Sequence, residues 1–298
     1  MANVRALLLI RPASFGFNPQ TAPSNHFQQR WQGNEFSTMA LAEFDSFVQR
    51  LRTTGIPLEI FEDTRDPQKP DAIFPNNWFS THADGSIVLY PIRAENRRTE
   101  RRMDIIKTLK KRYGYKTVHD LSPAEADGRF LEGTGSIVFD HSARIAYAAH
   151  SVRTDKDLLA EVCSKLHYTP FLFSTADRNS RPVYHTNVVM ALHDTLAVVC
   201  FDAVPENDRI ALKRSLEDSG KNIFAISMLQ MESFAGNMLF VTSPEGNDFV
   251  ILSDAAWQSL LPEQQSQLKT IAQPLLSNLT TIENCGGGSA RCMIAEII

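Results

Sequence analysis

Four side chains with complementary chemistry lie far apart in this sequence, each within a similar local pattern. They are Asp71 in PDAIFPNNW, Glu132 in RFLEGTGSIV, His185 in PVYHTNVV and Cys292 in SARCMI. Two carboxylates, an imidazole and a thiol form the set needed for nucleophilic attack on an electrophilic carbon that carries nitrogen. Each residue alone also fits a structural role, as a core thiol, a core histidine or a turn carboxylate. Their matched positions in a repeat favour a shared site.

The segment around Cys292 strengthens this interpretation. Gly286, Gly287 and Gly288 precede the thiol, and glycine lets a backbone approach a ligand where a Cβ atom would clash. The pKa of Cys292 must fall for it to attack, and a protonated His185 or a cationic substrate would lower it. Cys285 is expected to be structural.

The repeat is visible in short apolar runs. The tetrapeptide GSIV occurs at Gly85–Val88 and at Gly135–Val138, 50 residues apart. Similar runs begin at His185, Ala235 and Ser289. Small or polar residues ahead of an apolar run are typical of the opening of a buried strand. We therefore expect these runs to begin equivalent inner strands.

Second strands, helices and third strands follow these runs with a period of about 50 residues. Helices are predicted over 96–112, 155–168, 207–220 and 261–278. The fifth unit is divided: RALLLIRPAS and residues 39–61 begin the chain, and CMIAEII ends it. Five such units predict a closed α/β propeller, because closure removes unpaired sheet edges. One catalytic domain is expected to span 1–298.

Two further segments carry expectations. Residues 15–38 lack periodicity and are rich in Asn, Gln, Ser, Pro and Gly, so we interpret them as a flap over a site. The basic run NRRTERRMDIIKTLKKR contains Glu100 and Asp104, and it is interpreted as a solvated helix face.

Composition excludes several classes of protein. The 298 residues are 43% hydrophobic and carry a net charge of −4, which argues against nucleic acid or anionic membrane as a partner. No apolar run approaches the roughly 20 residues of a membrane helix, and the N-terminus does not resemble a secretory signal. A cytoplasmic protein is expected. The four cysteines form no CxxC pair, so we expect free thiols and no zinc site.

The motifs PDAIFPNNW, LEGTG, HTN and GGGSARC resemble those of the guanidino-group modifying superfamily, which includes arginine deiminases, dimethylargininases and amidinotransferases. The chain is similar in particular to the bacterial citrulline-utilisation hydrolase family. The resemblance runs from Arg11 to the C-terminus. FPNNWFSTH and GGGSARCM are specific, whereas LEGTG alone is weak. The fold of the superfamily is a five-bladed α/β propeller, in agreement with the repeat.

The resemblance implies roles for individual residues. Cys292 matches the nucleophile, His185 the general acid and base, and Glu132 the carboxylate of an EGGD-type motif. Asp71 matches the substrate-binding aspartate. Arg97 and Arg153 match arginines that hold the α-carboxylate of the substrate in dimethylargininases, a task that suits the planar guanidinium fork.

The sequence also departs from the family pattern. Asn76 and Asn77 stand where dimethylargininases carry Glu-Asp, and Gly135 stands at the second acid of the EGGD motif. A guanidinium prefers carboxylates, whereas an asparagine amide offers a donor and an acceptor to a neutral ureido group. These substitutions favour a ureido substrate such as citrulline, or a guanidine held in another orientation.

The resemblance implies a hydrolase for a C–N bond of a guanidino or ureido amino acid, working through a covalent cysteine intermediate without metal or organic cofactor. Two alternatives stay open: an amidinotransferase that passes the same intermediate to an amine, and a silent binder of arginine-like ligands. A homodimer also stays open.

Overall fold

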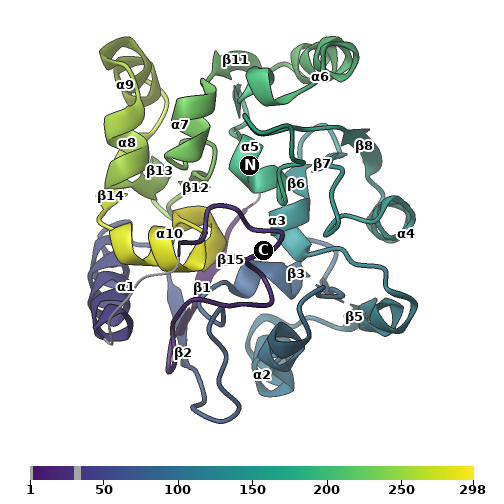
Figure 1. Cartoon of the computed structure of the whole chain (residues 1–298), viewed down its shortest axis with the longest axis vertical. Coiled ribbons are helices and arrows are strands. Elements are labelled where there is room, and N and C mark those ends of the chain that lie inside the picture. Colours follow the sequence, from purple (N-terminus) through teal and green to yellow (C-terminus); the bar gives the residue numbers. More distant parts are fainter. Residues whose placement is uncertain (1–2, 30–34) are drawn as a thin grey trace.

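Five three-stranded sheets surround a common axis (Figure 1). The computed structural model describes residues 3–29 and 35–298. In chain order the sheets contain β15 (Ala295–Ile297), β1 (Ala6–Arg11) and β2 (Leu58–Glu62); β3 (Phe79–Thr81), β4 (Ser86–Leu89) and β5 (Thr117–Asp120); β6 (Val138–Asp140), β7 (Ile145–Ala149) and β8 (Thr169–Phe173); β9 (Met190–Leu192), β10 (Leu196–Val199) and β11 (Asn222–Ala225); β12 (Leu239–Thr242), β13 (Asp248–Ser253) and β14 (Gln273–Ser277).

Each sheet follows one rule of pairing. The inner strand pairs antiparallel with the central strand, and the outer strand pairs parallel with the central strand, as in β3, β4 and β5. The chain reaches the outer strand through helices on the periphery. These helices are α1 (Phe36–Arg52), α2 (Met103–Tyr113), α4 (Lys156–Leu166), α6 (Glu206–Asp218), and α8 (Asp254–Ser259) with α9 (Pro262–Lys269).

The two ends of the described chain meet in one sheet, where β1 pairs antiparallel with β15. The register places Ala6 opposite Ile297 and Leu8 opposite Ala295. The predicted five-bladed propeller, closed by an apolar C-terminal strand, is confirmed by this arrangement.

A short helical turn lies ahead of the inner strands and is the feature that positions the site. These turns are η1 (Pro75–Asn77), α3 (Gly133–Ser136), α5 (Thr186–Val189), α7 (Met228–Glu232) and η5 (Ala290–Met293), with α10 (Thr280–Gly286) before the last of them. Other 3-10 segments are η2 (Glu95–Glu100), η3 (Ser122–Asp127) and η4 (Phe201–Ala203). Sequence reasoning did not predict the short turns.

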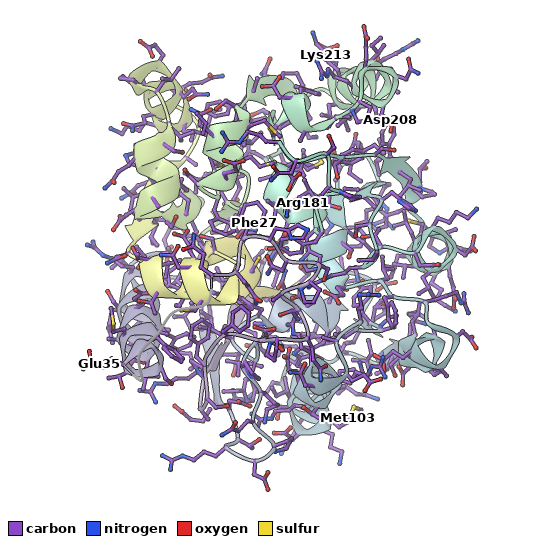
Figure 2. All side chains as sticks on the ribbon, in the orientation of Figure 1. Phe27, Glu35, Met103, Arg181, Asp208 and Lys213 are labelled. Atoms are coloured by element: carbon purple, nitrogen blue, oxygen red, sulfur yellow. The ribbon has the colours of Figure 1, made fainter. Side chains whose placement is uncertain are left out.

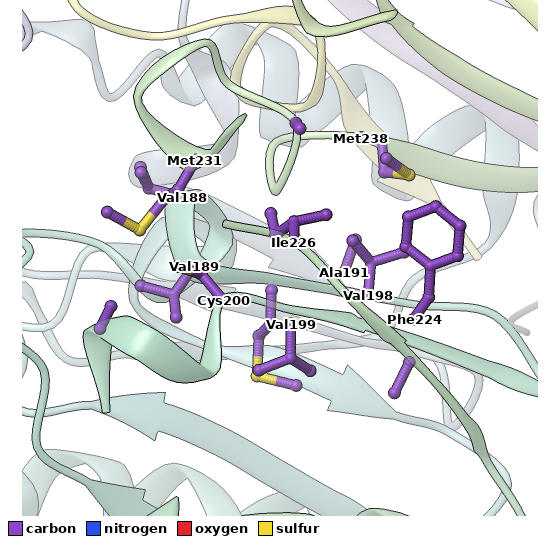
Figure 3. Close-up of a cluster of buried hydrophobic side chains, with 14 of the residues drawn as sticks. Val188, Val189, Ala191, Val198, Val199, Cys200, Phe224, Ile226, Met231 and Met238 are labelled. Carbon is purple, nitrogen blue, oxygen red and sulfur yellow. The ribbon is translucent and has the colours of Figure 1, made fainter. Parts of the chain in front are cut away.

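The helices follow ordinary helix chemistry. In α4, the Asp155 side chain caps the first turn by accepting from the amides of Asp157 and Leu158. Leu159, Val162 and Leu166 recur at helical spacing and are buried on one face. Packing of this kind forms apolar clusters between helices and sheets; the one shown in Figure 3 joins α5, β10 and β11 around Val188, Val198 and Phe224.

Three expectations need correction. The first GSIV falls in a central strand, β4, whereas the second leads into an inner strand, β6, so the two copies are not equivalent. The helix predicted over 261–278 ends at Lys269, because residues from Gln273 pair with β13 as strand β14. The basic run is solvated only in part: Arg97 and Glu100 are buried against each other.

Candidate active site

Cys292 lies in η5, immediately before the inner strand β15, and is 4% exposed. Its backbone amide donates to the Ser289 carbonyl at 2.9 Å. The Nδ2 atoms of Asn187 and Asn237 lie 3.4 and 3.2 Å from its Sγ. Burial raises the pKa of the thiol above its ordinary value, and these hydrogen bonds oppose the rise. Cys292 is therefore a neutral thiol in the unliganded protein at neutral pH.

His185 and Glu132 face each other across two neighbouring blades. Each residue is the N-cap of a short helix, α5 for His185 and α3 for Glu132. The His185 Nε2 atom lies 2.8 Å from Glu132 Oε2. Burial lowers the pKa of His185 to about 4, against the opposing effect of Glu132. His185 is thus a neutral imidazole that could accept a proton.

Glu132 is buried without exposed surface and remains ionised. Burial opposes its charge, but Arg153 and His185 outweigh that effect and hold the pKa of the carboxyl well below its usual range. Arg153 Nη1 donates to Oε2 at 3.1 Å, and the backbone amide of Arg93 donates to Oε1 at 3.1 Å. Both oxygens of Glu132 therefore have protein partners, and His185 lies between Glu132 and the pocket.

Asp71 lines the pocket with one unpartnered oxygen. Its Oδ2 atom accepts from Asn18 Nδ2 at 2.8 Å and from Thr21 Oγ1 at 3.3 Å, whereas Oδ1 is buried without a protein partner. Burial raises the pKa of this carboxyl, and the nearby Arg97 opposes the rise. Asp71 can therefore offer an acceptor to an N–H group of a ligand.

Arg97 is committed to protein partners. Its Nε and Nη2 atoms donate to the two oxygens of Glu100, each at 2.9 Å, and its Nη1 donates to Asn77 Oδ1 at 3.0 Å. Arg97 Nε also lies 3.6 Å from Asp71. The bond from Arg97 fixes the Asn77 amide so that Nδ2, which has no partner, is available as a donor.

Asn76 and Gly135 are two positions at which the sequence departs from the family pattern, and their surroundings differ. Asn76 is fully buried with both amide atoms unpartnered, but it does not line the pocket. At Gly135, a Cβ atom would come within 2.6 Å of Asn77 Nδ2 and 2.7 Å of His185 Nδ1. An acid at this position would displace both groups, so the glycine is a steric requirement of this site.

The N-terminal segment crosses in front of the centre of the propeller, where Phe27 lies (Figures 1 and 2), and its residues Thr21 and Asn25 line the pocket. Arg153 Nη2 donates to Ser24 Oγ at 2.8 Å and to the Thr21 carbonyl at 3.1 Å. Asn25 Nδ2 donates to the Gly287 carbonyl at 3.1 Å, and Gln28 Nε2 donates to the Gly286 carbonyl at 2.9 Å. The expected flap therefore lies over the site between residues 18 and 28; residues 30–34 of the predicted 15–38 segment lie outside the described part of the chain.

The glycines before Cys292 make room for protein as well as for the pocket. A Cβ atom on Gly287, whose φ is +63°, would come within 2.6 Å of Asn25, and one on Gly286 would come within 2.9 Å of Phe74. The glycine run therefore lets the covering segment dock close to the Cys292 loop.

The structure brings most predicted site residues together. The pocket is lined by Asp71, Asn77, Arg97, Arg153, His185 and Cys292, with Thr21, Asn25, Phe74, Tyr184 and the three glycines. Glu132 stands behind His185. Sequence reasoning missed Asn187, Asn237 and Glu100; the repeated HTN and AGN motifs, 50 residues apart, carried a signal for the first two.

A wider cavity occupies the other end of the axis, among the inner strands and the residues that follow them. It is lined by Phe79, His82, Phe139, His141, Met190, His193 and Glu296, among others, and it reaches Asn187. Cys292, His185 and Asp71 line the smaller pocket instead, so we place the chemistry there.

Within residues 3–29 and 35–298, no three His, Cys, Asp or Glu side chains gather closely enough to bind a metal ion. The same residues include no helix that is both apolar enough and long enough to traverse a bilayer.

Known structures share this fold at low sequence identity. ArgZ, an arginine dihydrolase from the ornithine-ammonia cycle in Cyanobacteria, superimposes with a TM-score of 0.74 at 16% identity, over 98% of this chain. The chain spans about 40% of the length of ArgZ. It spans 97% of the N-terminal domain of an ArgZ mutant covalently bound to a reaction intermediate, again with a TM-score of 0.74, 16% identity and 98% of this chain covered.

A dimethylargininase from Pseudomonas aeruginosa, whose mutant was solved with citrulline, gives a TM-score of 0.69 at 15% identity, over 99% of this chain and 100% of that one. No curated protein sequence matches the chain. The sequence profile of the family described as N,N dimethylarginine dimethylhydrolase, eukaryotic, matches residues 11–298. By this match, which covers nearly the whole chain and agrees with the resemblance read from its motifs, the protein belongs to that family of guanidino-modifying enzymes.

Proposed function

We propose that this protein hydrolyses a C–N bond of a ureido or guanidino amino acid through a covalent intermediate on Cys292. Membership of the family described as N,N dimethylarginine dimethylhydrolase supports a hydrolase for C–N bonds of amidino groups. One observation carries the finer assignment: a buried thiol, a neutral imidazole backed by a carboxylate, and an aspartate with a free oxygen share one enclosed pocket. This set supplies a nucleophile, a proton carrier and a group that orients nitrogen.

In the first half of the reaction, Cys292 gives its proton to the neutral imidazole of His185, and Sγ adds to the central carbon of the substrate. The bond from that carbon to the leaving nitrogen then breaks, and His185 delivers the proton to the departing amine or ammonia. Glu132 orients the imidazole and stabilises its charged form through the 2.8 Å hydrogen bond. Asp71 accepts a hydrogen bond from a substrate N–H group.

In the second half, His185 takes a proton from water, and the resulting hydroxide attacks the carbon bound to sulfur. The C–S bond breaks, and the sulfur recovers a proton. The same imidazole thus serves as base and acid in turn. The covering segment at residues 18–28 limits access of bulk water to the intermediate.

The pocket favours a ureido headgroup. A guanidinium has only donors, whereas a ureido group also has a carbonyl acceptor. Asn77 Nδ2 is a buried donor without a protein partner, and Arg97 prevents the amide from turning its oxygen to that side. Leaving a buried donor unpaired costs about 1–3 kcal/mol, so a carbonyl oxygen at Asn77 would be preferred over an N–H group. We therefore propose a citrulline-like substrate.

Of the two arginines in the family pattern, Arg153 is the better candidate for binding the α-carboxylate of the substrate. The Nε and Nη2 atoms of Arg97 already donate to the two carboxylate oxygens of Glu100. We assign Arg97 to holding Asn77 and Asp71. We assign Arg153 to the substrate carboxylate, because its Nη1 atom holds Glu132 whereas its remaining partners belong to the covering segment.

Turnover and the covalent adduct test the proposal together. Incubation with citrulline, arginine or methylated arginines, followed by mass spectrometry, should show an adduct on Cys292 and release of ammonia or amine. Cys292→Ser should lower kcat by at least about a thousandfold, because a hydroxyl without a strong base is a poor nucleophile. Cys285→Ser, a buried thiol outside the pocket, is the control and should keep activity.

The outcomes also separate the alternatives. Activity that disappears in Cys285→Ser and survives in Cys292→Ser would show that the wrong thiol was chosen. Consumption of an added amine acceptor during turnover would replace hydrolysis with amidino transfer. Ligand binding with neither turnover nor adduct would identify a silent binder.

A further inference from the structure

Two asparagines that the resemblance does not assign occupy matched places in neighbouring blades. Asn187 follows His185 in the HTN motif, and Asn237 follows Gly236 in the AGN motif, 50 residues later. Both are buried, at 1% and 0% exposure. Their Nδ2 atoms both point at Cys292 Sγ, at 3.4 and 3.2 Å.

The orientation of the Asn237 amide is determined by the backbone. Its Nδ2 atom donates to the Asn187 carbonyl at 2.9 Å as well as to Sγ. A flipped amide would place Oδ1 against that carbonyl oxygen, so the N–H side must face the sulfur. Gly236 allows this approach, since a Cβ atom there would come within 2.1 Å of the Val188 carbonyl oxygen.

Other sources of positive charge are committed elsewhere. Arg97 and Arg153, the arginines of the pocket, are paired with Glu100 and Glu132. Arg291, whose charge lowers the pKa of Cys292, is paired with Glu296 at 2.8 Å. His185 donates toward Glu132 and is neutral in the unliganded site. Burial meanwhile raises the pKa of Cys292. The two amides are therefore the side-chain donors in contact with the sulfur.

We propose that Asn187 and Asn237 are catalytic residues that form a two-donor cradle for the Cys292 thiolate. This inference rests on the proposed function. When the thiol proton moves to His185, the electron pair left on sulfur receives two charge-assisted N–H hydrogen bonds. When sulfur adds to carbon, that pair enters the C–S bond and the hydrogen bonds weaken. When the C–S bond breaks, the cradle receives the thiolate again as leaving group.

The test measures the ionisation of Cys292 without any substrate. Cys292 is alkylated with iodoacetamide across the pH range, and its modified peptide is followed by mass spectrometry. A hydrogen bond to a charged group corresponds to about one pKa unit or more. We expect the midpoint pH of alkylation to rise by about one unit in Asn187→Ala and further in the double variant with Asn237→Ala. Easier reagent access alone would raise the rate at every pH and leave the midpoint in place.

Controls keep the result interpretable. Asn222→Ala removes an amide that donates to the Thr195 carbonyl at 3.3 Å on an outer strand, and it should leave the midpoint unchanged. Asn237→Ala also removes the hydrogen bond to the Asn187 carbonyl. If that variant fails to fold, the midpoints of Asn187→Ala and Asn187→Asp test the proposal. Asn187→Asp keeps the size and replaces the donor with an acceptor, so its midpoint should rise more.

An unchanged midpoint in both Asn187 variants would overturn the cradle even if Cys292 proves to be the nucleophile. Conversely, a shifted midpoint in a protein that never forms a substrate adduct would refute the proposed function and retain the cradle. The two hypotheses therefore fail separately.

Discussion

The pocket contains two uncharged side chains, Cys292 and His185, among charged side chains that are paired with one another. Burial keeps Cys292 and His185 uncharged, with the pKa of the thiol raised and that of the imidazole lowered to about 4. Glu132 is charged and held by Arg153. In the proposed reaction the proton therefore moves within the pocket, and we expect the polar atoms left free there to select the headgroup.

At the scale of single residues, we predict that Asn77 sets the preference between a ureido and a guanidinium headgroup. Asn77→Asp removes the free Nδ2 donor and adds a negative charge beside Arg97, so a guanidinium should gain and a ureido carbonyl should lose. The ratio of kcat/KM for citrulline to that for arginine should fall by at least about tenfold, because one pKa unit of interaction corresponds to a tenfold change.

Asn77→Ala is the matched control, because it removes the donor without adding charge. It should weaken citrulline turnover and bring no gain for arginine. A wild-type enzyme that strongly prefers arginine, with a ratio that Asn77→Asp leaves unchanged, would contradict the ureido assignment.

The elements place these residues through short turns that precede the inner strands. Because Glu132 and His185 are the N-cap positions of α3 and α5, their side chains emerge at the same end of the propeller as Cys292 in η5. The segment at residues 18–28 closes this end. Polar contacts at Thr21, Ser24, Asn25 and Gln28 dock it.

The variant Asn25→Ala tests the docking of the segment at residues 18–28. It removes the donor to the Gly286 and Gly287 carbonyls, at 3.3 and 3.1 Å. The segment should open more often, so backbone amides of residues 18–28 should exchange hydrogen faster and KM should rise several-fold, with a smaller effect on kcat. Gln265→Ala, on the distant helix α9, should change neither quantity. Unchanged exchange in Asn25→Ala would show that other contacts hold the segment.

At the scale of the whole molecule, the blades meet around the axis. The end opposite the pocket that contains Cys292 is rich in histidine. His82, His141 and His193 directly follow the inner strands β3, β6 and β9. Burial lowers the pKa of each, in His82 to about 3. A histidine that is neutral in the fold and protonated when unfolded makes stability depend on pH.

His82→Gln tests this dependence. The unfolded chain binds a proton at His82 below its ordinary pKa of 6.5, whereas the folded protein does so only near 3, so stability is full above pH 6.5 and falls with acidification. Between pH 6.5 and 4 this residue should cost up to about 3 kcal/mol in the free energy of unfolding. Urea titrations should show a flatter acid slope in His82→Gln. An identical slope would show that His82 has the same pKa in the folded and unfolded protein.

Glu100 and Glu283, whose pKa values burial raises to about 7, act in the opposite direction over this range. They are unchanged in His82→Gln, so the difference between the two proteins isolates the histidine. Glutamine retains a polar group that can reach Ser80, the hydrogen-bond partner of His82 at 2.7 Å.

The sequence by itself determined the period, the order of strands and helices in a blade and the closing C-terminal strand, because strand runs and helix spacing are local properties. Motif chemistry, which is also local, predicted the site residues Asp71, Glu132, His185 and Cys292. Tertiary structure decided what depends on contacts between blades. Both strands of the hairpin around Gly85 are apolar, so only pairing with β5 showed that GSIV there is the central strand β4. Only the structure shows that Glu100 is buried as the partner of Arg97. It also shows that Gly135 must be a glycine, because Asn77 and His185 approach it too closely for a Cβ atom. The amides of Asn187 and Asn237 meet at Cys292 only because closure brings the last strand beside the earlier blades.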